Sequence, residues 1–154
     1  MPHTPVLKNK NLPIYLSGYT DGEGSFCVSF SPRSKLKAKV EIRPSFSVSQ
    51  NSDRAEVLYL YKEFFSCGSI RPDRSDKTFK YEVRGLEDLI TKIIPHFRKY
   101  PLLSSKQKDF ELFANICEQL TSKKFKLKEI ITLAFKMNTS GKRKFEQSYL
   151  YSLL

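Results

Sequence analysis

Two carboxylates stand beside two glycines in the stretch Thr20-Asp21-Gly22-Glu23-Gly24. Carboxylate and carbonyl oxygens are the ligands that a hard divalent cation such as Mg²⁺ prefers. Glycines end helices readily, so the two acidic side chains are expected at the foot of a helix that stops at Gly22 to Gly24. The alternative is an acidic surface turn after a glycine C-cap, with no chemistry attached.

Gly18 and Gly22 lie four residues apart, which places them on one face of a helix, one turn from each other. A face without side chains lets a second helix approach to backbone contact. A glycine inside a helix costs roughly 1 kcal/mol, so the helix expected over Leu12–Asp21, with Pro13 in its first turn, needs a packing reason for these glycines.

Period-two alternation predicts two β-hairpins behind this helix. The first pairs Ser25–Pro32 with Lys39–Gln50 across a basic loop, and the second pairs Ser69–Asp73 with Thr78–Arg84. The apolar residues of the second strand are expected on varying faces of the sheet. Pro44 interrupts that strand, which indicates an edge position or a bulge.

Helical spacing of apolar residues predicts the remaining elements. One helix begins with a box-like cap formed by Asp53 and Glu56. The others are expected over Leu86–Ile94, Ser105–Leu120, Lys126–Lys136 and Arg143–Leu153, and residues 1–10 form a loose arm. The order is therefore αββαββα plus C-terminal helices, an α+β chain whose 154 residues suit one domain, 1–154.

The charge balance points to a polyanionic partner. Lys plus Arg number 27 against 16 Asp plus Glu, a net charge of +11. The three cysteines are far apart, which excludes an all-disulfide framework and a zinc spacing and favours a reducing, intracellular compartment. No apolar run reaches the roughly 20 residues of a membrane span, and no signal or transit peptide is evident.

The stretch from Leu16 to Gly24 resembles the signature motif of the LAGLIDADG homing endonucleases. The positions that match it outright are Leu16, Gly18, Asp21, Gly22 and Gly24. Ser17 replaces an alanine, Tyr19 and Thr20 replace aliphatic residues, and Glu23 replaces the second acidic residue conservatively. The resemblance is to the branch that has one motif per chain and works as homodimers. It implies that family's fold, in which the antiparallel sheet is saddle-shaped, and an organelle (chloroplast or mitochondrion) or a prokaryotic cytoplasm as the setting.

Two further segments resemble the family's active site. Phe46-Ser47-Val48-Ser49-Gln50 followed by Arg54 resembles the segment that carries a peripheral Gln and Arg, and Lys106 matches an active-site Lys. The resemblance implies that Glu23 binds Mg²⁺, with Mn²⁺ or Ca²⁺ as possible substitutes, helped by the carbonyl of Gly22. Catalysis then falls to Glu23, Gln50, Arg54 and Lys106. Without the motif, these last three would be a strand end, a solvated helix start and a surface lysine.

The resemblance also implies the partners, namely double-stranded DNA and a second copy of the chain, with no membrane and no small-molecule substrate. The expected dimer interface comprises Leu16, Gly18, Tyr19, Asp21 and Gly22. A two-stranded ribbon fits a major groove, so the polar stripes of the hairpins become candidate DNA contacts. These are Ser29, Ser31, Arg33, Lys35, Lys37, Glu41, Arg43, Ser45, Ser47, Arg71, Asp73, Arg74, Thr78, Lys80 and Glu82.

The sequence therefore predicts a metal-dependent, site-specific DNA endonuclease of the intron-homing type, acting on a long pseudo-palindromic site. Two alternatives stay open. One is a non-catalytic nucleic-acid binder, such as an RNA-splicing maturase or a DNA-binding regulator. The other is a nuclease of a different design, because Asp73 followed by Glu82-Val83-Arg84 loosely resembles a PD-(D/E)xK site, although arginine stands where lysine belongs.

Overall fold

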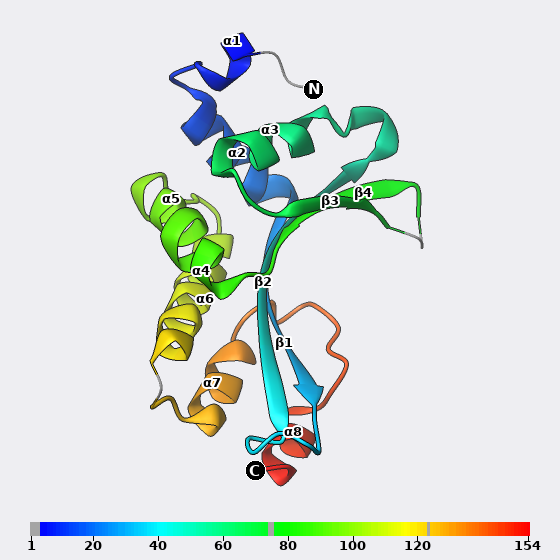
Figure 1. Cartoon of the computed structure of the whole chain (residues 1–154), viewed down its shortest axis with the longest axis vertical. Coiled ribbons are helices and arrows are strands. Elements are labelled where there is room, and N and C mark those ends of the chain that lie inside the picture. Colours follow the sequence, from blue (N-terminus) through cyan, green and yellow to red (C-terminus); the bar gives the residue numbers. More distant parts are fainter. Residues whose placement is uncertain (1–3, 74–75, 123) are drawn as a thin grey trace.

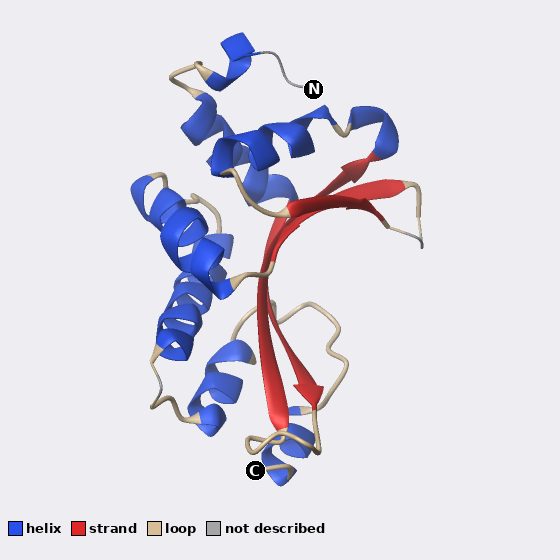
Figure 2. Cartoon of the chain, viewed as in Figure 1, coloured by secondary structure: helices blue, strands red, loops and turns tan. Residues whose placement is uncertain are grey.

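The computed structural model describes residues 4–73, 76–122 and 124–154, and it is built on one curved antiparallel sheet (Figures 1 and 2). The strands are β1 (Gly24–Pro32), β2 (Val40–Asn51), β3 (Ser69–Pro72) and β4 (Thr78–Val83), in the order β1-β2-β4-β3. Helices cover one side of the sheet, and the other side is open (Figure 2). The predicted α+β order is confirmed.

The helices precede, separate and follow the two hairpins along the chain. They are α1 (Thr4–Leu7), α2 (Leu12–Glu23), the 3₁₀ turn η1 (Ser52–Arg54), α3 (Glu56–Phe65), α4 (Leu86–Asp88), the π-helical η2 (Leu89–Ile93), α5 (Ile94–Lys99), α6 (Lys106–Thr121), α7 (Leu127–Ala134) and α8 (Gln147–Ser152). Among the described residues, no helix is long and apolar enough to span a bilayer.

The two faces of the sheet differ in chemistry because side chains alternate along each strand. Phe26, Val28 and Phe30 of β1 are buried, while Ser29 between them is exposed. The prediction for β2 was wrong: its apolar side chains share one face, since the register aligns Phe46 with Phe26. Pro44 lies where β2 pairs with β1 only, because pairing with β4 begins at Phe46, so the expected edge position is confirmed.

The core beneath the sheet is rich in aromatic rings. Phe26 lies 5.2–5.3 Å, centroid to centroid, from Phe46, Phe97, Phe110 and Phe113. Such pairs contribute about 0.5–1.5 kcal/mol each beyond the area they bury. Strands β1 and β2 are therefore fixed to α5 and α6, which holds the sheet rigid below its open face.

Three boundaries differ from the sequence prediction. Helix α2 continues through Gly22 to Glu23, because the Gly24 N–H still closes the last turn on the carbonyl of Thr20. The arm is not loose in its described part, since Thr4–Leu7 form α1, which contacts α3. The cap expected at Asp53 is absent from α3, which begins after the η1 turn without a side-chain cap.

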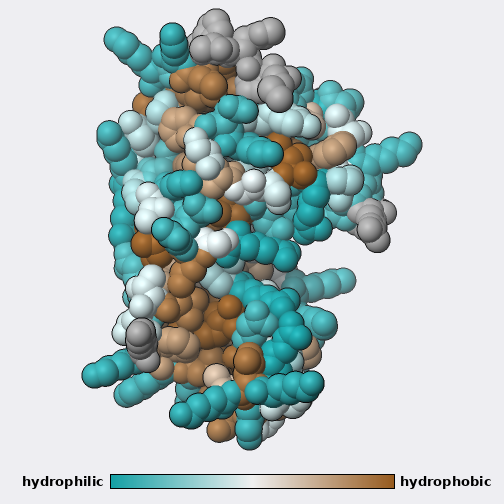
Figure 3. Space-filling model, in the orientation of Figure 1, coloured by the Kyte–Doolittle hydropathy of each residue, from teal (hydrophilic) through white to brown (hydrophobic). Residues whose placement is uncertain are grey.

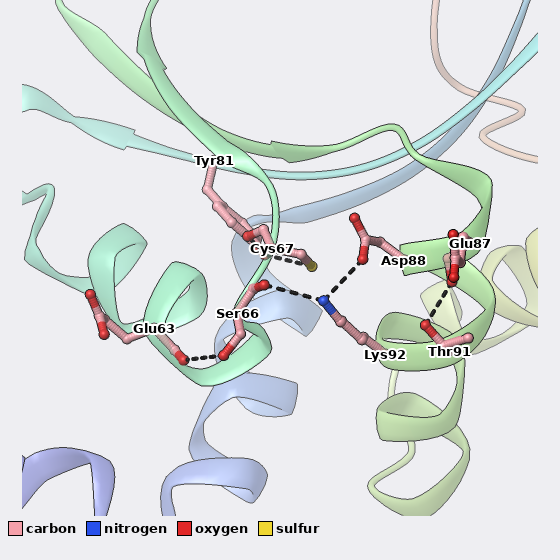
Figure 4. A network of polar contacts seen from close by, with 8 residues as sticks. All are labelled: Glu63, Ser66, Cys67, Tyr81, Glu87, Asp88, Thr91 and Lys92. Carbon is pink, nitrogen blue, oxygen red and sulfur yellow. Dashed lines mark hydrogen bonds and ion pairs between the residues drawn. The ribbon is translucent and has the colours of Figure 1, made fainter.

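A polar joint fixes the second hairpin to the helices (Figure 4). Ser66 ends α3 in the left-handed conformation, and Lys92 Nζ donates to its carbonyl at 3.2 Å while pairing with Asp88 at 3.0 Å. The Tyr81 hydroxyl donates to the carbonyl of Cys67 at 3.1 Å. These contacts satisfy carbonyls that the end of α3 leaves without helical partners, so β3 starts from a defined position.

Candidate active site and nucleic-acid interface

The candidate active site lies where α2 meets β1. Glu23 is the last residue of α2 and is exposed, and β1 begins at the next residue. Gly24 has an ordinary extended conformation (φ −86°, ψ 162°), so its φ does not require glycine. A Cβ there would lie 2.5 Å from Thr20 Cγ2 and 2.9 Å from the Thr20 carbonyl oxygen, and this close approach does require glycine.

The inner side of α2 is held by hydrogen bonds as well as by apolar packing. Ser17 Oγ donates to the carbonyl of Tyr100 at 2.7 Å and lies 3.1 Å from His96 Nε2. Burial lowers the pKa of His96 to about 4, so the ring is neutral at pH 7. Because the Ser17 hydrogen goes to Tyr100, the His96 Nε2–H is the donor in that pair. The Tyr61 hydroxyl, 2.8 Å from Thr20 Oγ1, also donates to the Leu16 carbonyl at 2.8 Å.

Lys106 reaches the foot of α2 from the first turn of α6. Its ammonium donates to the carbonyl of Thr20 at 2.9 Å and to that of Gly24 at 2.6 Å. Burial lowers the pKa of Lys106, against the opposing charges of Asp21, Glu23 and Asp109. An ammonium has three donors, so one remains for a negatively charged ligand beside Glu23.

Asp21 connects the end of α2 to the loop before α6. It accepts from the backbone N–H groups of Leu103 (2.9 Å) and Ser104 (3.0 Å), and from the Ser104 hydroxyl. Burial raises its pKa, but these hydrogen bonds and the charge of Lys106 outweigh that effect and leave the pKa below its usual value. The loop before α6, and hence Lys106, is therefore positioned by α2 itself.

Gln50 joins the same corner, whereas Arg54 stands apart. The Gln50 amide nitrogen donates to the Tyr19 hydroxyl, and its carbonyl oxygen accepts from the Asn51 N–H at 2.8 Å. Arg54 is exposed at the end of η1 and, in the part of the chain that the structure describes, makes no hydrogen bond or ion pair with Glu23, Gln50 or Lys106. Three of the four predicted catalytic residues are thus tied to the C-terminal half of α2: Glu23 ends it, Lys106 binds the Thr20 carbonyl and Gln50 binds Tyr19, one turn before Glu23.

A divalent cation fits this corner only with help from outside one chain. Within residues 4–73, 76–122 and 124–154, no group of three or more His, Cys, Asp or Glu side chains could hold a metal. Glu23 offers an exposed carboxylate, and the carbonyl of Gly22 is among those that the end of a helix leaves without a helical partner. A carboxylate plus carbonyls is a hard oxygen set, which suits a cation that takes its other ligands from water and phosphate.

The outer face of α2 is open, and its residues differ in part from the dimer interface that the sequence predicted. A Cβ at Gly18 or Gly22 would meet nothing within 4 Å. Ile14 and Tyr15 extend this face, at 63% and 50% exposure, and the sequence prediction missed them. Placing Leu16 on this face was wrong, because it is fully buried within its own chain.

Two other residues assigned to that face are engaged within the chain. Tyr19 is half-buried and accepts from Gln50, and Asp21 binds the loop before α6. The open face of α2 therefore consists of Ile14, Gly18 and Gly22, which are spaced four residues apart on one side of the helix, with Tyr15 beside them. The spacing of Ile14 from Gly18 was the sequence signal that would have found it.

The open face of the sheet carries the polar side chains that were predicted to contact DNA. The register places Ser29 opposite Arg43, Ser31 opposite Glu41, Ser47 opposite Glu82, and Arg71 opposite Lys80. Arg33, Lys35 and Lys37 lie exposed in the loop at the far end of the first hairpin, and Arg74 lies outside the described residues. In Figure 3, the side toward which the sheet opens is mostly hydrophilic, whereas hydrophobic colour gathers over α6 and α7.

Acidic side chains on this face are paired with basic ones. Glu41 lies within 3.1 Å of Arg33 and Arg43, and Glu82 within 3.2 Å of Arg71 and Arg84. Asp73 lies 3.9 Å from Lys80. Glu82 is thus bound by two guanidinium groups, which does not fit the metal ligand that the PD-(D/E)xK alternative requires.

The C-terminal part of the chain closes the outer edge of β1. Asn138 Nδ2 donates to the carbonyl of Phe26 at 2.7 Å, so the unpaired strand edge is covered. Arg143 turns inward, donating to the carbonyl of Met137 at 2.7 Å over the ring of Phe135. Lys142 and Lys144 stay exposed, and a groove of ≈690 Å³ runs from Lys106 past Asn138 to Lys142.

Comparisons with known proteins agree on one family. A family model described as "LAGLIDADG endonuclease" matches residues 16–117. The chain is 28% identical over 147 residues to "Homing endonuclease I-ApeII" of Aeropyrum pernix, covering 91% of this chain and 86% of that protein. It spans only 31%, 21% and 25% of the length of three other curated relatives.

Solved structures give the same answer for the fold. The "Archaeal Intron-encoded Homing Endonuclease I-Vdi141I Complexed With DNA" superposes with a TM-score of 0.83 at 27% identity, over 92% of each chain. "I-SmaMI bound to uncleaved DNA target in the presence of Calcium ions" superposes with a TM-score of 0.81 at 30% identity, over 91% of this chain and 47% of that one.

Proposed function

This chain belongs to the LAGLIDADG endonuclease family, and from that premise we propose that it is a site-specific double-stranded DNA endonuclease of the homing type. It works as a homodimer, hydrolyses phosphodiesters with a divalent cation, Mg²⁺ in the first place, and recognises a long pseudo-palindromic site. The observation that supports this proposal is the corner at the foot of α2, where Lys106 binds the backbone on both sides of Glu23 and Gln50 binds Tyr19 one turn earlier, beside a polar sheet face.

Glu23 and the carbonyl of Gly22 are the residues that would hold the cation. When bound, it supplies Lewis-acid stabilisation of a phosphoryl oxygen and an activated water. The third donor of Lys106 is free to hydrogen-bond a non-bridging phosphate oxygen, where negative charge grows during attack. Gln50, oriented by Tyr19 and Asn51, is placed to position water. Arg54 is exposed and would approach the phosphate backbone of the DNA from the side.

Two copies are needed because one chain has one corner and DNA has two strands. The open face of α2 supports a two-fold contact: Gly18 and Gly22 present no side chain, and Ile14 and Tyr15 are apolar and exposed. Helices that meet at glycines approach to backbone contact. A two-fold axis at this face brings two Glu23 residues together and sets the two sheets side by side as one longer saddle.

The coding context follows the relatives. Several similar proteins are named as intron-encoded, one of them as archaeal, and we place this chain in an intron of an organelle or a prokaryote, the settings that the sequence predicted. The alternative function, nucleic-acid binding without catalysis, requires the polar sheet face. It does not require that Lys106 bind the carbonyls at the end of α2.

A cleavage selection tests the proposal. Purified protein is incubated with a randomised duplex library, with Mg²⁺ and with EDTA, and the cut ends are sequenced. The expected result is Mg²⁺-dependent enrichment of one long, pseudo-palindromic sequence. Enrichment by binding without any cleavage would favour the alternative function, and no enrichment of either kind would contradict both.

A further inference from the structure

The two hairpins carry the same charged arrangement. Glu41-Ile42-Arg43 on β2 and Glu82-Val83-Arg84 at the end of β4 both place a glutamate and an arginine two residues apart, hence on one strand face. A second arginine approaches each glutamate from the rest of its hairpin: Arg33 beyond β1, and Arg71 from β3. Each hairpin thus contains an arginine pair bridged by one carboxylate.

The two clusters use the same kinds of atoms, with one Nε and one Nη2 on a single carboxylate oxygen, but the same-strand arginine and the second arginine exchange these roles. Glu41 Oε2 lies 3.1 Å from Arg33 Nε and 2.9 Å from Arg43 Nη2. Glu82 Oε2 lies 3.1 Å from Arg84 Nε and 3.2 Å from Arg71 Nη2. Each guanidinium has five N–H donors in a fixed fork, and the glutamate contact uses one of its nitrogens, so donors remain for a ligand.

A bridging carboxylate changes what the arginines can do. Two guanidinium groups this close repel each other, and without the glutamate each would swing toward the nearest phosphate. With it, the pair carries one net positive charge instead of two and has fewer orientations. Hydrogen bonds from Arg43 and Arg33 lower the pKa of Glu41, so the carboxylate stays ionised at neutral pH.

The clusters differ in depth and place. The Glu82 side chain is 10% exposed and the Glu41 side chain 40%. The register puts Glu82 in one row with Ser47 and Ser25, two residues after Glu23, whereas Glu41 pairs with Ser31. The six residue steps from Ser25 to Ser31 span about 20 Å, the length of about six base pairs.

We propose that Glu41 and Glu82 are positioning residues that hold the two arginine pairs for base reading, so that sequence discrimination depends on glutamates that need not touch a base. The inference rests on the proposed function and names part of its specificity. It departs from the prediction made from the sequence, which placed both glutamates among the direct DNA contacts. Glu82 controls base pairs near the centre of the site, and Glu41 controls base pairs about six steps further out.

The test uses three variants of the full chain: Glu41→Gln, Glu82→Gln and, as a control with the same charge change, Glu63→Gln on α3. Each is measured for binding to a specific and to an unrelated duplex over a range of salt, and for cleavage of every single-base variant of the site. The first two should bind unrelated DNA more tightly, with a salt slope steeper by about 1–2 for a dimer. They should lose about tenfold discrimination at separate positions, inner for Glu82 and outer for Glu41.

The outcomes separate this inference from the proposed function. A wild-type chain that neither binds nor cuts DNA selectively removes the proposed function. A selective wild type with a Glu41→Gln profile equal to that of Glu63→Gln overturns the positioning role. Because Glu41 is exposed, its variant folds and decides the matter even if Glu82→Gln is unstable by circular dichroism.

Discussion

The corner at the foot of α2 and the open face of the sheet are both polar, but their side chains are held in different ways. In the corner, Lys106 donates to backbone carbonyls of α2 and β1, and Asp21 accepts from backbone N–H groups of a distant loop. On the sheet, the charged side chains bind one another, as Arg33 and Arg43 bind Glu41. The fold fixes the first set, and the second set can rearrange.

The difference separates chemistry from recognition. A group anchored to the backbone keeps its place whichever DNA is bound, as a catalytic group must. A group anchored to another side chain is restricted by that partner but held less firmly than by the backbone, because surface ion pairs contribute only about 0–1 kcal/mol, so its unused donors can adjust to the base that they meet. Substitutions in the corner should therefore abolish reaction on every sequence, and substitutions on the sheet should change which sequence reacts.

The largest effect is expected from Glu23→Gln. The amide keeps the size but removes the charge that a hard cation requires, so cleavage should fall by at least about 1,000-fold. Binding to the target in Ca²⁺ should stay within about threefold, because the sheet is untouched. Gel-based cleavage and binding assays measure both. Undiminished turnover, with wild-type contamination excluded, would remove Glu23 from the site.

Lys106→Met should lower cleavage by about 100- to 1,000-fold, through loss of a donor to the phosphate. It should also lower the free energy of unfolding by about 1–3 kcal/mol, because the carbonyls of Thr20 and Gly24 each lose the hydrogen bond from the Lys106 ammonium. Urea denaturation and single-turnover cleavage separate the two effects. Lys62→Met, an exposed lysine on α3, is the matched control, and an equal loss of activity there would refute the assignment.

Gly18→Val should weaken the dimer without disturbing the fold or the active-site corner of either protomer. A Cβ at Gly18 meets nothing within 4 Å, so the single chain accepts valine, and helix propensity improves. Dimerisation should weaken by at least about 100-fold, equal to about 3 kcal/mol of lost helix contact. Sedimentation and thermal melts measure the two outcomes. Gly24→Val is the contrast, since its side chain would clash with Thr20 and should unfold the chain; an intact Gly18→Val dimer would place the interface elsewhere.

The smallest effect belongs to the sheet. Arg43→Ala should relax discrimination by about 10- to 100-fold at matching positions in both half-sites, the value of one bidentate contact to guanine. Cleavage of the preferred site should fall far less than in the corner variants. A profile over all single-base variants measures this, with Arg98→Ala on α5 as the control. A change in only one half-site would contradict the two-fold arrangement.

The sequence predicted the strands well because their signal is local. Alternation of Phe26, Val28 and Phe30 with polar residues placed β1 within one residue of its observed start. The paired Glu41-Ile42-Arg43 and Glu82-Val83-Arg84 segments were readable by the same period, although the glutamates were read as base contacts. The glycine signal placed the stop of α2 at Gly22 to Gly24, and Gly24 is the C-cap, but the bound at Asp21 was two residues short because the Gly24 N–H still bonds the Thr20 carbonyl.

The proposed dimer interface was predicted only in part, because a sequence motif does not say which of its residues lie on the outer face of the helix. Leu16 matches the family motif but points into the core, and Ile14 lies outside the motif but shares a face with Gly18. The anchoring of Lys106 was beyond sequence reasoning, since its bonds to Thr20 and Gly24 join residues more than 80 positions apart. Only packing of α6 against β1 creates that contact.

The central claim is that each protomer cuts one strand with its own corner. The direct test is a mixed dimer of one wild-type and one Lys106→Met chain, isolated through two different affinity tags and given a supercoiled plasmid with the preferred site. The account predicts nicked circles with the break always in the strand served by the wild-type protomer, while the wild-type homodimer gives linear DNA. Linear product from the mixed dimer at the wild-type rate would show that one corner serves both strands and would contradict the account.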